Sequence, residues 1–232
     1  MLAHWPNTQR HSANTSEYFD LTNHYKSFTN PFYSFLGEPY NLIEKVLLFD
    51  KTIIEDNMKT TDKITIRPET KSDIIPIAEV TRKAFGGTQE ADSLRTMRIQ
   101  RFLSISLVAM QEEQLVGHIA FTSLFVQKHP SPSRMLGLAP LSVLPSHQGQ
   151  GIGSLLVRFG VDACILAGVD VVMVLGCSDY FARFGFQPAD QYDLLYDREG
   201  MDDAFYGMEL KKGMIGKYSG KVAFHPAMRV VL

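Results

Sequence analysis

Leu141-Ser-Val-Leu-Pro-Ser-His-Gln-Gly-Gln-Gly-Ile-Gly-Ser-Leu-Leu-Val157 is the stretch that decides the fold of this 232-residue chain. An apolar run with Pro145 near its end passes into a turn with Gly149, Gly151 and Gly153, and a helical pattern follows with its apolar residues on one face. The first turn of a helix leaves backbone N–H groups without intrahelical partners, and the helix dipole adds partial positive charge there. Because glycine has no Cβ, a phosphate can approach such N–H groups closely. The stretch therefore predicts a strand, a phosphate-binding loop and a helix.

Three kinds of phosphate-binding loop are alternative interpretations of this pattern. A nucleotide P-loop needs Lys and then Ser or Thr after its last glycine, whereas Ser154 and Leu155 follow here, so that interpretation is excluded. A dinucleotide loop needs a third glycine where Ser154 stands, and an acid at the end of the next strand. Asp170 opens the next apolar run instead of closing it, which disfavours a dinucleotide enzyme. The pattern Q/R-x-x-G-x-G is matched at every position by residues 148–153.

Residues 138–157 resemble the acetyl-CoA-binding segment of the GNAT superfamily of N-acetyltransferases, in particular its group of small predicted bacterial acetyltransferases. Residues 180–186 resemble the family's Y-x-R-x-G-F segment, and residues 220–228 resemble that group's C-terminal motif, so the resemblance spans about 62–228. It implies an α/β (mixed α+β) fold with a central mixed, mostly antiparallel sheet flanked by helices. The fourth and fifth strands would splay apart, with acetyl-CoA in the opening.

The resemblance also implies which residues bind acetyl-CoA. The backbone of Leu141, Ser142 and Val143 would pair with the pantetheine arm, and the Val143 N–H would polarise the thioester carbonyl. The pyrophosphate would be held by the loop and the start of the helix, namely Gln148, Gly149, Gln150, Gly151, Ile152, Gly153 and Ser154.

Acetyl transfer also requires a deprotonated amine and a protonated leaving thiolate. Many family members place a general-acid Tyr four residues before the glycine of G-F, but Phe181 stands there in this chain. Tyr180 is the candidate acid and Glu90 the candidate base, with His118 as another basic group. Each has a structural alternative: Tyr180 as a packing residue, Glu90 as a first-turn acid favoured by the helix dipole, and His118 as a core residue. A water relay would make a dedicated base unnecessary.

Composition limits the class of protein. With 45% hydrophobic and 21% charged residues the chain can bury a core of its own. A net charge of −2 gives no general attraction to nucleic acid or anionic membranes. Cys164 and Cys177 are not in metal-binding or redox spacing, so we expect reduced thiols, no metal and a cytoplasmic protein without a secretory signal. Dimers are common in the superfamily, so a homodimer is one possible assembly.

The chain divides unequally. Residues 1–57 are rich in Asn, Thr, Ser and aromatic residues and are expected to be a poorly ordered extension, with the acetyltransferase domain at 58–232. A helix is expected to begin with Ser72 as its N-cap. The expected helices are 72–85, 91–103, 151–167 and 179–184. The expected strands are 64–67, a hairpin over 107–126, 136–144 with a bulge at Pro140, 169–175, 186–190 and 204–210.

The predicted function is transfer of acetyl from acetyl-CoA to a primary amine of a small molecule or protein, by direct attack in a ternary complex. The alternative is a catalytically weak or inactive acyl-CoA-binding or sensing module, and Phe181 is its main support. Residues 86–104 and 190–204 should shape the acceptor pocket. The acids of the second segment would attract a cationic amine, or would form a solvated loop.

Overall fold

The computed structural model describes residues 64–127, 133–198 and 200–228 of the chain. The predicted extension 1–57 lies outside the described residues, as does its boundary at Met58.

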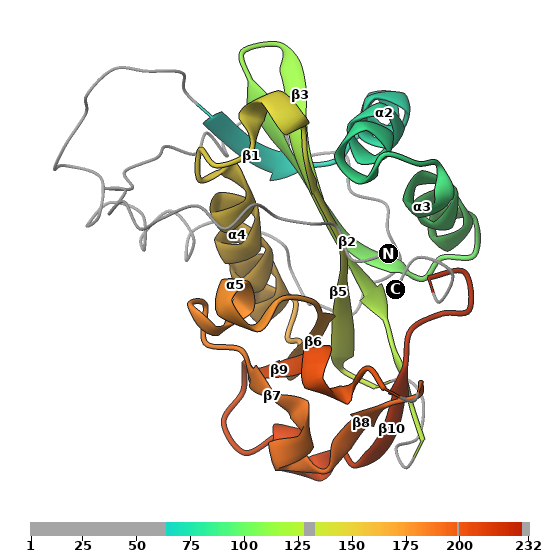
Figure 1. Ribbon diagram of the computed structural model, residues 1–232, viewed down its shortest axis with the longest axis vertical. Helices are drawn as coiled ribbons and strands as arrows, with labels where there is room; N and C mark the ends of the chain where they lie inside the picture. The colour runs from blue at the N-terminus through green and yellow to red at the C-terminus, as the bar shows by residue number, and fades with distance from the viewer. Residues whose placement is uncertain (1–63, 128–132, 199, 229–232) are drawn as a thin grey trace, which may run out of the picture.

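A seven-stranded sheet forms the centre of the structure, in the order β1-β2-β3-β5-β6-β9-β7 (Figure 1). Neighbouring strands are antiparallel except β5 and β6, which are parallel. The strands are β1 Ile64–Pro68, β2 Leu103–Gln111, β3 Gln114–Ser123, β5 Met135–Val143, β6 Val171–Leu175, β9 Phe205–Glu209 and β7 Gln187–Pro188. The predicted mixed, mostly antiparallel sheet is confirmed.

Helices cover both faces of this sheet (Figure 1). On one face, Thr81 of α2 lies 3.4 Å from the Ser142 hydroxyl of β5. On the other face, a Cβ built at Gly117 of β3 would lie 3.0 Å from Leu156 of α4. The helices are α2 Ile74–Phe85, α3 Gln89–Ile99, α4 Ile152–Leu166 and α5 Ser178–Ala182, with short 3-10 turns that include η3 Lys71–Asp73 and η4 Pro145–His147.

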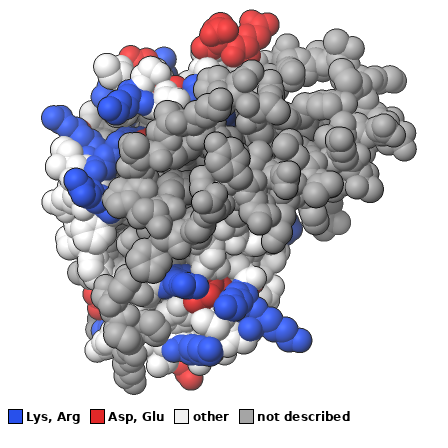
Figure 2. Space-filling view, turned by 180° about the vertical axis from the view of Figure 1, so that it is seen from behind, with Lys and Arg blue, Asp and Glu red and all other residues white. Residues whose placement is uncertain are grey.

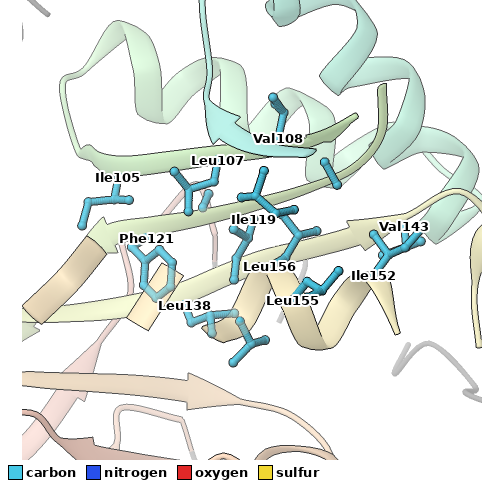
Figure 3. Packing of buried hydrophobic residues seen from close by; sticks show 14 of the residues in the cluster. Ile105, Leu107, Val108, Ile119, Phe121, Leu138, Val143, Ile152, Leu155 and Leu156 are labelled. Carbon is cyan, nitrogen blue, oxygen red and sulfur yellow. The ribbon is translucent and has the colours of Figure 1, made fainter. Parts of the chain in front are cut away.

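The main core lies between α4 and the centre of the sheet. Figure 3 shows the side chains of Ile152 and Leu156 from α4 lying against those of the strands, including Ile119 and Phe121. Ile119, Phe121 and Leu156 are fully buried. A Cβ built at Gly160 would come within 2.5 Å of the Phe121 ring, so glycine is what lets the helix backbone lie this close to β3. This packing fixes the start of α4 against the end of β5.

The strands β5 and β6 pair only over their first halves. Their register runs from Met135↔Val171 to Leu138↔Val174 and stops there, while β5 continues to Val143 beside β3. Pro140, which has no N–H to donate, lies just beyond that point, and the β3–β5 register shifts between Ile119 and Phe121. The predicted irregularity at Pro140 and the predicted splay are both confirmed.

Two sequence predictions need correction, and one part of the fold was not predicted. Ser72 is not the N-cap: Thr70 and Asp73 form a capping box around η3, and the Thr70 N–H donates to Asp73 Oδ2 at 2.6 Å. The second helix ends at Ile99 and not at residue 103, because the chain turns at Arg101, whose φ is +60°, and then enters β2. A second sheet was not predicted, and its strands are, in spatial order, β4 Phe125–Val126, β10 Gly220–Ala223 and β8 Leu194–Tyr196.

Charged side chains of both signs lie on the described part of the face that Figure 2 shows. Figure 2 shows acidic side chains gathered at the end of the molecule where Figure 1 places the β2–β3 turn, whose exposed acids are Glu112 and Glu113. Within the described residues, every helix is too short or too polar to cross a membrane.

Candidate functional site

The glycine-rich loop joins the free end of β5 to α4. The Gln148 side chain turns back and donates to the Val143 carbonyl at 3.1 Å, which fixes where the loop begins. His147 binds Gln111 of β2 through Nε2 at 2.8 Å. Gly149 and Gly151 have φ of +77° and +89°, values that L side chains rarely adopt. Two of the three glycines are therefore required by the path of the backbone itself.

The first turn of α4 presents its N–H groups at this loop. Gly151 is the N-cap, and its carbonyl accepts from the N–H groups of Ser154 and Leu155 at 2.9 and 3.1 Å. The N–H groups of Ile152 and Gly153 precede these first helical bonds and lack intrahelical acceptors. No acidic residue stands in the first turn of α4. These free N–H groups are the geometry that an anion site built from backbone requires, and the phosphate site itself stays a prediction.

The backbone groups of the last residues of β5 point alternately toward β3 and toward the opposite edge of the strand. The Leu144 N–H donates to Val116 of β3 at 2.9 Å, and Ser142 is paired with His118. In an antiparallel ladder, alternate residues direct their backbone groups to opposite edges. Ser142 therefore bonds toward β3, whereas Leu141 and Val143 present their N–H and C=O groups on the side where β5 has left β6. Only these two of the three predicted strand residues have backbone groups on the open edge.

The helix α5 lies beside α4 (Figure 1), and it contacts the first turn of that helix. A Cβ built at Gly153 would lie 2.7 Å from the Tyr180 hydroxyl and 3.8 Å from Val143 Cγ2, so the third glycine makes room for Tyr180. Arg183 Nη2 donates to Ser154 Oγ at 3.1 Å, and the guanidinium lies 4.1 Å from the Tyr180 ring centre. The structure thus brings Tyr180 to the predicted cofactor loop. From the sequence, Arg183 of the Y-x-R-x-G-F segment was expected to be a solvated helix residue, and its contact with Ser154 of α4 was not predicted.

Tyr180 and Phe181 have different surroundings. Burial raises the pKa of the Tyr180 hydroxyl, against the lowering effects of Arg183 and Ser154, so the phenol is protonated at neutral pH. The Phe181 ring is buried and makes edge contacts with Tyr180 at 5.0 Å and Phe186 at 5.6 Å. The position to which the sequence resemblance assigns a general acid is therefore an apolar core position in this chain.

Glu90 lies in the first turn of α3, half-buried, on the sheet face opposite α4. The structure does not bring Glu90 and Tyr180 together on one face of the sheet. In the predicted acceptor segment 190–204, the carboxylate of Asp202 accepts from the Tyr196 N–H at 3.0 Å. This acid therefore holds the local turn.

His118 is fully buried within a polar network that the sequence did not indicate. Two N–H groups of Arg98 donate to Glu69 at 2.9 and 2.7 Å, and the Ser106 hydroxyl donates to the same carboxylate at 2.5 Å. Ser106 Oγ also lies 2.8 Å from His118 Nε2. Because the Ser106 proton goes to Glu69, we assign Nε2 of His118 as the protonated nitrogen.

Burial lowers the pKa of His118 to about 3, so the ring is neutral, and its side chain is 0% exposed. His118 is thus a core residue, which agrees with the structural interpretation of the sequence and not with a role as a base. Its partners were missed because they are scattered over the chain. Among the described residues, no cluster of three or more His, Cys, Asp or Glu side chains could hold a metal ion.

Comparison with known proteins agrees with this geometry. Residues 75–186 match the Acetyltransferase (GNAT) family. The chain is 32% identical over 161 residues to the uncharacterized N-acetyltransferase YhbS of Escherichia coli K12, an alignment that covers 69% of this chain and 95% of YhbS. The chain belongs to the GNAT family of acetyltransferases. A second GNAT relative, the uncharacterized N-acetyltransferase YjhQ of the same organism, is 37% identical over 131 residues, which cover 56% of this chain and 72% of YjhQ.

Solved GNAT structures share the fold. The crystal structure of E. coli YhbS in complex with CoA superimposes with a TM-score of 0.70 at 30% identity, covering 75% of this chain and 96% of YhbS. A GNAT acetyltransferase from Brucella melitensis in complex with acetyl-CoA gives a TM-score of 0.61 at 31% identity, covering 72% and 99%. The resemblance drawn from the sequence is therefore confirmed at the level of family and fold, and the protein is an N-acetyltransferase by family.

Proposed function

We propose that this GNAT protein transfers the acetyl group of acetyl-CoA to a primary amine by direct attack in a ternary complex. The observation that carries the proposal is the glycine loop at the start of α4, placed beside the edge where β5 leaves β6. The crystal structures of two relatives at 30% and 31% identity contain CoA and acetyl-CoA, which supports the choice of cofactor.

In this proposal the opening between β5 and β6 takes the pantetheine arm, with Leu141 and Val143 pairing through their backbone. Ser142 contributes by holding β5 to β3. The pyrophosphate lies on the loop and the first turn of α4, formed by Gln148, Gly149, Gln150, Gly151, Ile152, Gly153 and Ser154. Because these donors are fixed before the cofactor arrives, their orientation costs little on binding.

The reaction follows from these positions. The lone pair of the amine attacks the thioester carbon, and the resulting oxyanion accepts a hydrogen bond from the Val143 N–H. Collapse of the tetrahedral intermediate forms the amide and breaks the C–S bond. Tyr180, next to Gly153 and Val143, gives the thiolate its proton, and Glu90 takes the proton that the amine loses. Since α4 and the loop occupy one face, the amine would approach from the face of α2 and α3, where Glu90 lies.

Two measurements on the full chain test this function. Thermal unfolding with acetyl-CoA at a hundred times its Kd should show about 2.7 kcal/mol of stabilisation, and a Gly151→Val variant should show none, because a β-branched residue is strained at φ +89°. Incubation with a panel of amines should then release CoA and yield acetylated amine, followed by thiol assay and mass spectrometry. No stabilisation by acetyl-CoA or CoA would refute the cofactor assignment.

The buried ring of Phe181 favours a second candidate, an acyl-CoA-binding module without turnover. The same experiment distinguishes the two. Stabilisation by acetyl-CoA without acetylation of any amine, and without CoA release, would support the binding module over the enzyme.

A further inference from the structure

Arg183 extends from the end of α5 to the start of α4. Its Nη2 donates to Ser154 Oγ at 3.1 Å, and its guanidinium carbon lies 4.1 Å from the Tyr180 ring centre and 4.9 Å from the Phe184 ring centre. Stacking on two rings and one hydrogen bond hold this exposed side chain in place, although it belongs to a helix 29 residues further along the chain. Its position at the glycine loop is therefore set by the tertiary fold.

This position brings two positive groups together. The start of α4 carries the positive end of the helix dipole, and a cation is unfavourable there. Of the ion pairs between described residues, none involves Arg183, so no carboxylate of the described part lies within 4.0 Å of its guanidinium. The first turn of α4 contains no acid either. The repulsion between the guanidinium and the helix start would be relieved by an anion bound between them.

We propose that Arg183 binds the pyrophosphate of the cofactor and that Tyr180 holds its guanidinium in place for this task. The inference rests on the proposed function. It goes further by assigning a charged side chain to a site whose other ligands are backbone groups. A guanidinium suits this role because its N–H groups form paired, charge-assisted hydrogen bonds with phosphate oxygens. The pyrophosphate is favoured over the 3′-phosphate because Arg183 is bonded to Ser154, in the same helical turn whose N–H groups face the loop.

The test compares Arg183→Gln with the wild type by calorimetric titration of CoA, dephospho-CoA and pantetheine. We expect CoA and dephospho-CoA, which both keep the pyrophosphate, to bind tenfold or more weakly to the variant, and pantetheine affinity to stay unchanged. The ligand-free variant should unfold at the same temperature as the wild type or higher, because a repulsion has been removed. Arg183→Lys keeps the charge but loses the stacked, paired geometry of the guanidinium, so its CoA affinity should lie between those of the wild type and Arg183→Gln. Arg95→Gln on exposed α3 removes an equal charge from the other face and should change neither affinity.

Several outcomes would overturn the inference. Unchanged CoA affinity in Arg183→Gln would remove the proposed contact, and a loss for CoA but not for dephospho-CoA would move the contact to the 3′-phosphate. Equal weakening of CoA and pantetheine, with a lower unfolding temperature, would mean that Arg183 only supports the fold. If wild-type protein bound none of the phosphate-containing ligands, the proposed function itself would fail, and this inference with it.

Discussion

The contact between Gly153 and Tyr180 depends on the absence of a side chain at Gly153. Because glycine has no Cβ, the Tyr180 hydroxyl can lie against the first turn of α4. Gly153 has an ordinary φ, unlike Gly149 and Gly151, so its conformation does not demand glycine. What demands glycine is the Tyr180 hydroxyl, which occupies the space where a Cβ would lie. The three glycines of the loop therefore serve two purposes, two for the backbone path and one for a side chain from another helix.

Gly153→Ala tests this contact. The added methyl should displace the Tyr180 hydroxyl, and acetyl-CoA affinity and turnover should each fall about tenfold, because Tyr180 and the stacked Arg183 move together. Stability should change by no more than about 0.5 kcal/mol, since alanine suits a helix. Titration calorimetry, CoA release and urea unfolding provide the three measurements. Gly216→Ala, where a Cβ would meet nothing within 4 Å, is the matched control and should behave as wild type. An unimpaired Gly153→Ala would show that Tyr180 has no such role.

Tyr180→Phe separates the hydroxyl from the ring. The ring keeps the stack with Arg183, so acetyl-CoA binding should be unchanged, while turnover should fall tenfold or more if the phenol protonates the thiolate. Tyr206→Phe removes a hydroxyl that donates to the Asp203 carbonyl at 3.0 Å and should leave turnover unchanged. Equal turnover in Tyr180→Phe and wild type would exclude Tyr180 as the acid.

The sequence predicts site residues that lie close together along the chain, but it does not predict contacts between residues that only the fold brings together. Gly149, Gly151 and Gln148 could be recognised because a phosphate loop has a fixed spacing along the chain. The Arg183–Ser154 bond could not, because it joins residues 29 positions apart, and neither could the Glu69–Ser106–His118 network, which depends on how three separate segments come together.

At the scale of elements, α4 is the piece that carries the loop, and its packing on β3 sets where the loop can be. Gly160→Ala would place a methyl 2.5 Å from the Phe121 ring, which has 0% exposure and no room to move. We expect a loss of about 1–3 kcal/mol in the free energy of unfolding, in spite of the higher helix propensity of alanine. Urea denaturation measures it. Gly87→Ala, with nothing within 4 Å, is the control, and an equal effect of both changes would contradict the close approach.

The elements that the sequence predicted are those with enough residues to show a period. The predicted helix 151–167 differs from α4 by one residue at each end, and the hairpin of β2 and β3 was found with its turn. The second sheet was missed because β4, β8 and β10 have two, three and four residues, too few for an alternating pattern to be recognised. The early end of α3 was missed because Arg101 turns the chain with a positive φ that its residue type does not indicate.

At the level of the whole molecule, one polar network joins four separate parts of the chain. Arg98 comes from α3, Glu69 from the segment that follows β1, Ser106 from β2 and His118 from β3. Glu69 and His118 of this network are each held in one protonation state. Arg98 and Ser106 stabilise the Glu69 carboxylate against the desolvation that burial imposes, and the net effect is a lowered pKa for Glu69. Burial keeps His118 neutral. A network held in one charge state links the stability of the whole fold to pH.

The pH dependence has a definite sign and window. The pKa of His118 falls from an ordinary value of 6.5 to about 3 on folding, so between these values only the unfolded chain binds the proton. The stability from neutral His118 is therefore present above pH 6.5 and is lost as the pH falls toward 3. Between pH 6.5 and 5 the loss should be about 1.5–2 kcal/mol. The carboxyl groups of Asp73 and Glu69 lose their stabilising effect only below pH 5, since the pKa of Asp73 is lowered from 3.8 to about 2 and that of Glu69 lies below 4.5.

Urea unfolding at pH 7, 6.5, 5.5 and 5 measures this dependence, and His118→Gln is the variant that isolates it. A Gln amide can still donate to Ser106 but does not titrate, so the variant should lose most of the slope between pH 6.5 and 5 while its stability at pH 7 falls only modestly. The lowered pKa of His225 acts in the same direction and accounts for a small residual slope. If His118→Gln kept the full slope of the wild type, the buried neutral histidine would not be its source, and the acid sensitivity would have to arise outside this network.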